Sequence, residues 1–174
     1  MNETQIYYRY TMIMGAYTAG AFILNTLLYL LFSSIFEPGM QLINYFIATI
    51  FIFIGVTNYR EQHLNGIISF GIALKTSVLI LFWSSIAFAV FMYIAARFIQ
   101  PNLTSQYLQM LEESLIKAGT PADQVDSLMD VYTMVLTPFT IAFAELFNKT
   151  FLGLIMGLAI AFFVKRKPAE NSTI

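Results

Sequence analysis

The sequence contains no cysteine and a single histidine, and only 11% of its residues are charged. The lack of cysteine excludes a disulfide framework, a thiolate nucleophile and a cysteine-ligated zinc or iron–sulfur site. One histidine, His63, offers too few ligands for an ordinary zinc or haem centre. We therefore expect neither a metal nor a cofactor.

The few charges are nearly balanced, with nine Lys and Arg against ten Asp and Glu, so the sequence provides no basic surface for nucleic acid. An average soluble domain carries about 25% charged residues. This chain is 58% hydrophobic and has a mean hydropathy of +0.70. A soluble domain of this size would need more polar surface to cover its core, so we expect the lipid bilayer to be the partner.

Four long apolar runs account for the hydrophobicity, and they cover residues 10–36, 41–58, 75–97 and 139–164. About 20 apolar residues, rising 1.5 Å each along a helix, cross a hydrocarbon core of about 30 Å. Backbone polar groups cannot remain unpaired in lipid, and the sequence has no alternating strands that could form a barrel. The prediction is a single all-α membrane domain over residues 1–174, with four transmembrane helices and no cleaved signal.

The placement of lysine and arginine predicts the orientation of these helices. With both termini inside, the cytoplasmic side carries six basic residues and the outer side carries two. The six are Arg9, Arg60, Lys75, Lys165, Arg166 and Lys167, and the two are Arg97 and Lys117. We therefore expect a multi-pass protein of the bacterial inner membrane with both termini in the cytoplasm.

A polar segment separates the third and fourth apolar runs and reads as an amphipathic helical hairpin over residues 103–136. Gly119 is a natural stop between its two helices. In the second helix, Val125, Leu128 and Tyr132 repeat at helical spacing. The hairpin carries one lysine and five acidic residues, which does not favour binding to anionic lipid. It is expected to cap the bundle or to dock a partner, with Leu128 and Tyr132 as candidate contacts.

Polar residues inside the apolar runs are candidates for function. Glu145 and Lys149 lie four residues apart in the fourth run, and Asn148 lies beside them. They form either an interfacial pair that neutralises itself or a contact for a ligand or partner. Asn25, near the middle of the first run, is interpreted as a packing contact between helices, and a polar substrate path is the alternative.

Small residues give the fourth run a smooth face, in the pattern Gly153-x-x-x-Gly157-x-x-x-Ala161. Such a face lets another helix approach closely. It serves either packing within the chain or contact in a homo-oligomer, and the sequence leaves both possibilities open.

The densest group of reactive side chains is Tyr59, Arg60, Glu61 and His63, which we place in a cytoplasmic loop. Glu61 and His63 could act as base and acid. No nucleophile elbow, metal-ligand spacing or phosphate-binding glycine loop accompanies them. A solvated loop with Arg60 facing headgroup phosphates is the simpler interpretation. Tyrosines 7, 8, 10 and 93 are interpreted as anchors at the membrane interfaces.

Several segments together resemble a bacterial membrane family, the domain of unknown function 4199, which is common in Bacteroidota. They are Gly15-x-x-x-x-Gly20, Asn58-Tyr59-Arg60-Glu61, the stretch from Gly66 to Lys75, and the final Lys165-Arg166-Lys167. The resemblance extends from about Thr11 to Lys167. It implies a helical inner-membrane protein without an established activity, and an accessory role beside membrane-associated glycosyltransferases. It carries over no catalytic residue.

Three functions are compatible with the sequence. The first is a non-catalytic accessory or scaffold protein that anchors a partner, such as a polyprenyl-phosphate glycosyltransferase, or forms a homo-oligomer. The alternative is a small-solute transporter or channel subunit that uses Glu145 and Lys149. The third is a lipid-modifying enzyme that uses the segment around His63. We expect the first, and therefore no enzymatic activity.

Overall fold

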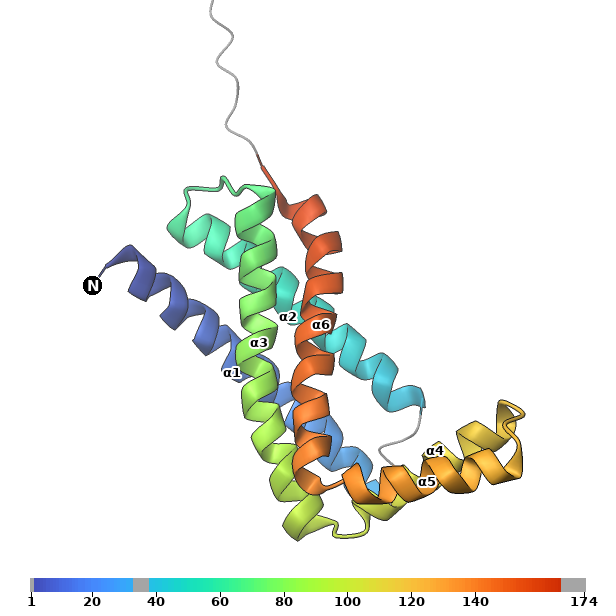
Figure 1. Cartoon of the computed structure of the whole chain (residues 1–174). Coiled ribbons are helices and arrows are strands. Elements are labelled where there is room, and N and C mark those ends of the chain that lie inside the picture. The colour runs from blue at the N-terminus through green and yellow to red at the C-terminus, as the bar shows by residue number, and fades with distance from the viewer. Residues whose placement is uncertain (1, 33–37, 167–174) are drawn as a thin grey trace, which may run out of the picture. The chain divides into compact units, whose positions relative to one another are not determined.

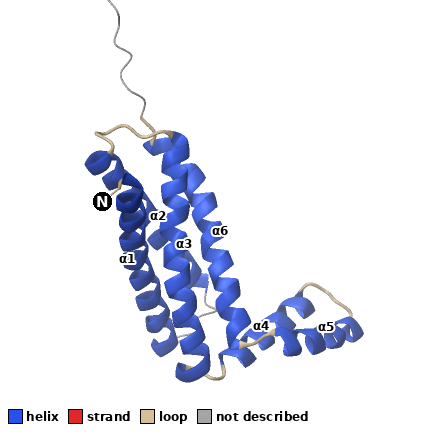
Figure 2. Cartoon of the chain, turned by 60° about the vertical axis from the view of Figure 1, so that its left-hand side comes forward, coloured by secondary structure: helices blue, strands red, loops and turns tan. Residues whose placement is uncertain are grey.

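The computed structural model describes residues 2–32 and 38–166, and within them every regular element is helical (Figures 1 and 2). The elements are α1 (Glu3–Phe32), α2 (Pro38–His63), α3 (Phe70–Ile94), the π-helical turn η1 (Ala95–Ile99), α4 (Leu103–Lys117), α5 (Ala122–Val135) and α6 (Pro138–Val164). The predicted all-α class is confirmed.

In the described part of the chain, four helices are long and apolar enough to cross a membrane: α1, α2, α3 together with η1, and α6. The protein is therefore a multi-pass membrane protein. The helices extend beyond the predicted spans. Helix α1 begins at Glu3 and not at residue 10, and α2 continues to His63 and not to residue 58. Hydropathy marks where the chain leaves lipid, whereas a helix can continue into the polar flank. The predicted end of the first span, at 33–36, and Lys167 lie outside the described residues.

The chain divides into two compact units, and the divisions fall within α3 and α6. The bundle unit comprises the described residues of 1–88 and 146–174, and the hairpin unit comprises 89–145. The bundle unit contains α1, α2 and most of α3 and α6. The hairpin unit contains η1, α4 and α5.

Within the bundle unit, α3 packs closely against the other three helices through glycines on each of them. A Cβ atom added to Gly15 of α1 would lie 2.6 Å from the Cβ of Trp83, and one added to Gly55 of α2 would lie 2.5 Å from Ile80 Cδ1. Such distances leave no room for a methyl group without displacement of the neighbour. The same relation holds on α6 for Gly153 against Leu81 and for Gly157 against Ser77.

Hydrogen bonds between polar side chains also join the helices of the bundle unit. Asn25 Nδ2 of α1 donates to Asn44 Oδ1 of α2 at 3.1 Å. The hydroxyls of Ser85 in α3 and Thr150 in α6 lie 3.0 Å apart. Such bonds between polar side chains stabilise the packing of helices in an apolar environment.

In the hairpin unit, α4 and α5 pack against each other as an antiparallel pair (Figure 2). Gly119 adopts φ +78° after the last turn of α4, and its N–H donates to the Ile116 carbonyl. This left-handed conformation suits glycine, because a Cβ would be strained there. Gly119 therefore lies between the two helices, as the sequence predicted.

Candidate functional site

Aromatic side chains gather where α1 begins and α2 ends. The Tyr59 ring lies 5.1 Å from that of Tyr7, 5.3 Å from that of Tyr10 and 5.1 Å from that of His63. Tyr10 also meets His63 edge-on at 5.5 Å. We call Tyr7, Tyr10, Tyr59 and His63 the aromatic cluster. Residues 7 and 10 share one face of α1, and residues 59 and 63 share one face of α2, so the helical spacing brings the four rings together.

Hydrogen bonds hold two of these tyrosines between helices. The hydroxyl of Tyr7 lies 3.2 Å from Thr76 Oγ1 of α3, and the hydroxyl of Tyr10 donates to the Gly55 carbonyl at 2.7 Å. Tyr7 is buried, and its ring is part of the contact between α1, α2 and α3. Its interpretation as an anchor at the membrane interface stays a prediction. Tyr8, the next residue, is exposed.

The segment from Tyr59 to His63 is not a loop, because it forms the last turn of α2. Arg60 does not face headgroups either. Its side chain is buried, pairs with Glu61 Oε1 at 2.7 Å and donates from Nη1 to the carbonyl of Val164 at 2.9 Å. A guanidinium is well placed there, because the carbonyls at a helix C-terminus lack partners and carry partial negative charge. Arg60 is therefore a structural contact between α2 and α6.

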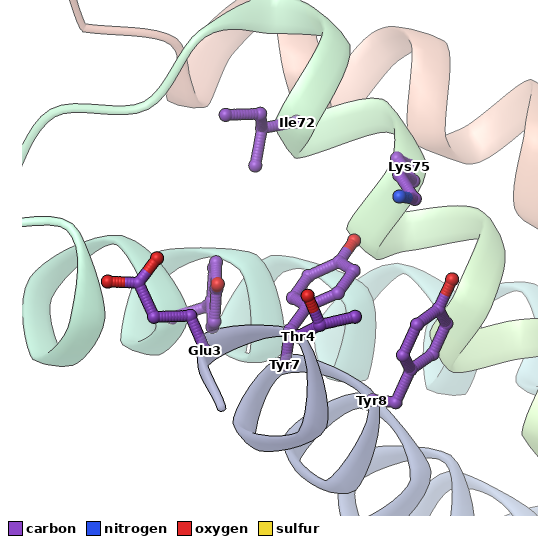
Figure 3. Close-up of a pocket in the computed structure, with 7 residues that line it drawn as sticks. Glu3, Thr4, Tyr7, Tyr8, Ile72 and Lys75 are labelled. Carbon is purple, nitrogen blue, oxygen red and sulfur yellow. The ribbon is translucent and has the colours of Figure 1, made fainter. Parts of the chain in front are cut away.

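A pocket of about 250 Å³ opens beside the aromatic cluster (Figure 3). Its walls are Glu3, Thr4, Tyr7, Tyr8, Tyr59, Ile72 and Lys75. The Lys75 ammonium lies over the rings of Tyr7 and Tyr8, 5.4 Å and 5.9 Å from their centres. Figure 3 shows Glu3 near one end of the pocket and Lys75 at the other, with the Tyr7 ring between them. The pocket thus has one acidic end, one basic end and aromatic walls.

A second hollow of about 360 Å³ shares Glu3 and Tyr59 with this pocket and is further lined by Ile6, Gln62, His63 and Leu64. Glu61 is not among its lining residues, since Glu61 pairs with Arg60. The suggested pairing of Glu61 as base with His63 as acid therefore gains no support. Within residues 2–32 and 38–166, no three His, Asp or Glu side chains are grouped so as to hold a metal ion.

Lys149 lies inside the bundle unit with only 5% of its surface exposed. Its ammonium is 4.4 Å from the centre of the Phe22 ring and 4.1 Å from that of Phe88. A cation over two desolvated ring faces is held by cation–π attraction. The Lys149 side chain therefore packs within the bundle unit, and both interpretations of the Glu145–Lys149 pair, as an interfacial pair or as a ligand contact, stay predictions. Of its predicted companions, Asn148 is exposed and Glu145 is half-buried in the hairpin unit.

Other predicted residues have structural roles within their units. Asn25 is buried and bonded to Asn44, which favours packing over a substrate path. Gly153 and Gly157 face α3, so their smooth face serves packing within the chain.

The two predicted hairpin contacts differ in accessibility. Leu128 is 38% exposed, whereas Tyr132 is half-buried. Leu128 is therefore the more accessible of the two to a partner.

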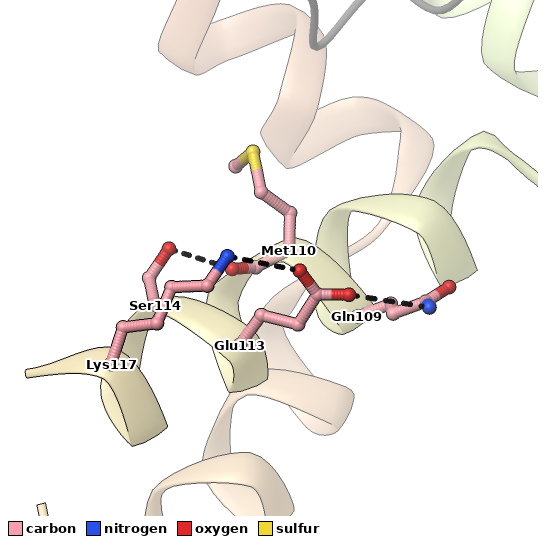
Figure 4. A network of polar contacts seen from close by, with 5 residues as sticks. All are labelled: Gln109, Met110, Glu113, Ser114 and Lys117. Carbon is pink, nitrogen blue, oxygen red and sulfur yellow. Dashed lines mark hydrogen bonds and ion pairs between the residues drawn. The ribbon is translucent and has the colours of Figure 1, made fainter. Parts of the chain in front are cut away.

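Acidic and basic side chains of α4 form a local network on its surface (Figure 4). Lys117 Nζ lies 3.4 Å from Glu113 Oε2, and Gln109 Nε2 donates to the other oxygen of Glu113 at 3.5 Å. Exposed pairs of this kind contribute about 0.3–0.5 kcal/mol. The network supports the helix and suggests no chemistry.

Sequence reasoning missed the pocket and the aromatic surroundings of Lys149. The spacing of Tyr59 and His63 indicates a shared helix face, but only if both residues are helical. The sequence placed them in a loop, so this signal was not used. Nothing in the sequence pairs Lys149 with Phe22 or Phe88, because the three residues lie on three different helices.

The chain belongs to the family described as "Protein of unknown function (DUF4199)", whose model matches residues 10–166. This confirms the resemblance inferred from the sequence. No curated protein and no solved structure matches the chain significantly. The family assignment therefore brings no activity with it.

Proposed function

We propose that the protein is a non-catalytic accessory protein of the bacterial inner membrane, with both termini in the cytoplasm, and that its hairpin docks a membrane-associated partner. The observation that carries this proposal is an exposed apolar strip on α5. Helix α5 has 14 residues, too few to cross the membrane, so the strip is not explained by burial in a transmembrane span.

The strip consists of Leu128, Val131 and Val135, which are 38%, 57% and 55% exposed, together with Met134 at 81%. The strip begins beside Val125, which is buried one turn before Leu128, and it extends around α5 to the exposed Met134. An extramembrane apolar surface of this kind marks an interaction site. Asp123, Asp126 and Asp130 lie on the same helix and oppose its attachment to an anionic bilayer, which favours a protein as the occupant.

The acidic residues also indicate the character of the partner. A polyprenyl-phosphate glycosyltransferase binds a phosphate-bearing lipid, and basic side chains are the usual ligands of phosphate. Acidic residues beside an apolar strip complement a basic surface of this type. We therefore propose an enzyme of this class as the partner.

The test compares two substitutions on α5 in the protein extracted from its native host in mild detergent. Val131→Glu places a charge within the strip, and Thr133→Glu places one on an exposed position beside the acidic residues. The wild type and Thr133→Glu should co-purify with a stoichiometric membrane enzyme that Val131→Glu has lost. Co-purification that is equal in both variants, or a wild type that carries no partner, would refute the docking role.

Lys149 supports a second candidate, a small-solute transporter or channel subunit. An ionisable residue buried in a transmembrane bundle indicates function more often than packing. In proteoliposomes, this function predicts flux of a small ion or solute through the wild type and its loss in Lys149→Met. Equal flux through the two proteins, or none through either, would leave the accessory role as the better explanation.

A further inference from the structure

We propose that the pocket between Glu3 and Lys75 binds a zwitterionic head group that carries a phosphate and a primary ammonium, as in phosphatidylethanolamine. The proposal is independent of the accessory function, because the pocket lies in the bundle unit and the apolar strip lies in the hairpin unit.

The position of the pocket suits a lipid head group. It lies where α1 and α3 begin and α2 ends, so each of its helices is entering or leaving an apolar segment. Exposed Glu3 and Lys75 side chains belong at the headgroup level, because charged groups are costly in hydrocarbon. Tyrosines are likewise typical of this level. The pocket therefore opens where phospholipid head groups are concentrated.

The charges of the pocket select a ligand with two opposite charges. Lys75 can donate up to three hydrogen bonds, which suits a phosphate, and Glu3 accepts hydrogen bonds, which suits an ammonium. Within the described part of the chain neither residue forms an ion pair with another side chain. A bare phosphate or an anionic head group would use Lys75 but would be repelled by Glu3. A zwitterion uses both.

The aromatic walls reinforce the acidic end. The rings of Tyr7 and Tyr59 lie 5.1 Å apart and both line the pocket with Glu3. Ring faces attract cations, and the Tyr7 ring already lies under Lys75. Tyr59, which lines the pocket with Glu3, is therefore the ring that would add cation–π attraction to the charge pair. A primary ammonium can also donate hydrogen bonds to the carboxylate, whereas the trimethylammonium of choline cannot.

The size of the pocket fits a head group and not a whole lipid. Its volume of about 250 Å³ is below the range of about 300–1,000 Å³ found for sites that enclose drug-sized ligands. The acyl chains would remain in the bilayer beside α1 and α3. A free amino-phosphate would present the same chemistry, so the experiment must separate the two sources.

The test measures lipid retention by the purified full-length protein in detergent, with native mass spectrometry as the readout. Phosphatidylethanolamine, phosphatidylglycerol and phosphatidylcholine with identical acyl chains are supplied in equal amounts. The wild type should retain phosphatidylethanolamine about three- to fivefold better than phosphatidylglycerol, the size expected for one exposed charge pair. It should also retain it better than phosphatidylcholine, whose trimethylammonium keeps the charge but donates no hydrogen bond to Glu3. Glu3→Gln should remove that preference, and Lys75→Gln should lower the retention of all three phospholipids.

Arg9→Gln is the matched control, because Arg9 is exposed on α1 but does not line the pocket. It should leave the preference unchanged. Free O-phosphoethanolamine, titrated calorimetrically into the same proteins, separates the sources. Binding of the free compound without any lipid preference would assign the site to a soluble amino-phosphate. Equal retention of the three lipids without binding of the free compound, or a preference that survives both Glu3→Gln and Lys75→Gln, would overturn the proposal.

Discussion

Arg60 Nη1 donates a 2.9 Å hydrogen bond to the carbonyl oxygen of Val164, which lies 104 residues further along the chain. The bond joins the last turn of α2 to the last residue of α6. Ile68 follows the end of α2, and it forms an isolated antiparallel bridge with Arg166, which follows the end of α6. The two N···O distances of the bridge are 3.2 Å and 3.0 Å. The end of α2 and the segment that follows it are thus each attached at one point to the end of α6.

Replacing Arg60 should therefore destabilise the bundle unit. Arg60→Gln removes a charged donor from a buried carbonyl, a loss of about 1.5–3 kcal/mol. Equilibrium unfolding by sodium dodecyl sulfate, followed by circular dichroism, measures the change in the free energy of unfolding. Arg9→Gln removes the same charge from an exposed position of α1 and should cost less than about 0.5 kcal/mol. Equal stability of the two variants would show that the Arg60–Val164 bond contributes nothing.

Gly15 and Gly20 of α1 allow the same substitution to be compared at a crowded position and at an open one. A Cβ on Gly15 would lie 2.6 Å from Trp83 Cβ and 2.9 Å from the Ile80 carbonyl oxygen, whereas one on Gly20 would meet nothing within 4 Å. Gly15→Ala should cost about 1–3 kcal/mol, because backbone cannot move aside cheaply.

Gly20→Ala should instead be neutral or slightly stabilising, because alanine is the better helix former. Thermal unfolding in detergent gives both values. A larger loss for Gly20→Ala than for Gly15→Ala would contradict the close approach of α1 to α3.

The four spans could be predicted from the sequence because lipid imposes a simple requirement, namely about 20 apolar residues in a helix. The same requirement does not predict which helices contact one another, since positions that face lipid and positions that face another helix are both apolar. This is why Gly15 and Gly20 look alike in the sequence although only Gly15 faces another helix.

The candidate site was harder to predict because its residues come from three helices. Arg60 looked like a loop residue because it follows the second apolar run, but α2 continues beyond that run and turns Arg60 toward α6. Lys149 looked interfacial from its distance to Lys165 along the chain. Its position between Phe22 and Phe88 depends on how α1, α3 and α6 pack, which hydropathy does not encode.

The hydrogen bond between Asn25 and Asn44 should contribute to the association of α1 with α2. A double-mutant cycle with Asn25→Leu, Asn44→Leu and the double variant isolates the coupling. We expect a coupling energy of about 0.6–2 kcal/mol, the range for polar contacts between transmembrane helices. Unfolding in sodium dodecyl sulfate supplies the four free energies. A coupling close to zero would mean that each asparagine finds another partner when the first is removed.

Tyr107 of α4 should make the protein sensitive to alkaline pH. Burial raises the pKa of the Tyr107 phenol above its usual value of 10.0, and the nearby carboxylate of Glu145 raises it further. The folded state therefore holds the proton more tightly than the unfolded state. The stability that Tyr107 contributes is complete below pH 10 and is lost as the pH rises toward the folded-state pKa.

Tyr107→Phe should consequently unfold at a temperature that falls less steeply above pH 10 than that of the wild type. Circular dichroism in detergent at pH 8 to about 11 measures the two slopes, over the range in which an unfolded tyrosine ionises. If Tyr107→Phe and the wild type lose stability in parallel, the fold does not hold the phenol protonated. That result would contradict the burial of the Tyr107 side chain in the hairpin unit.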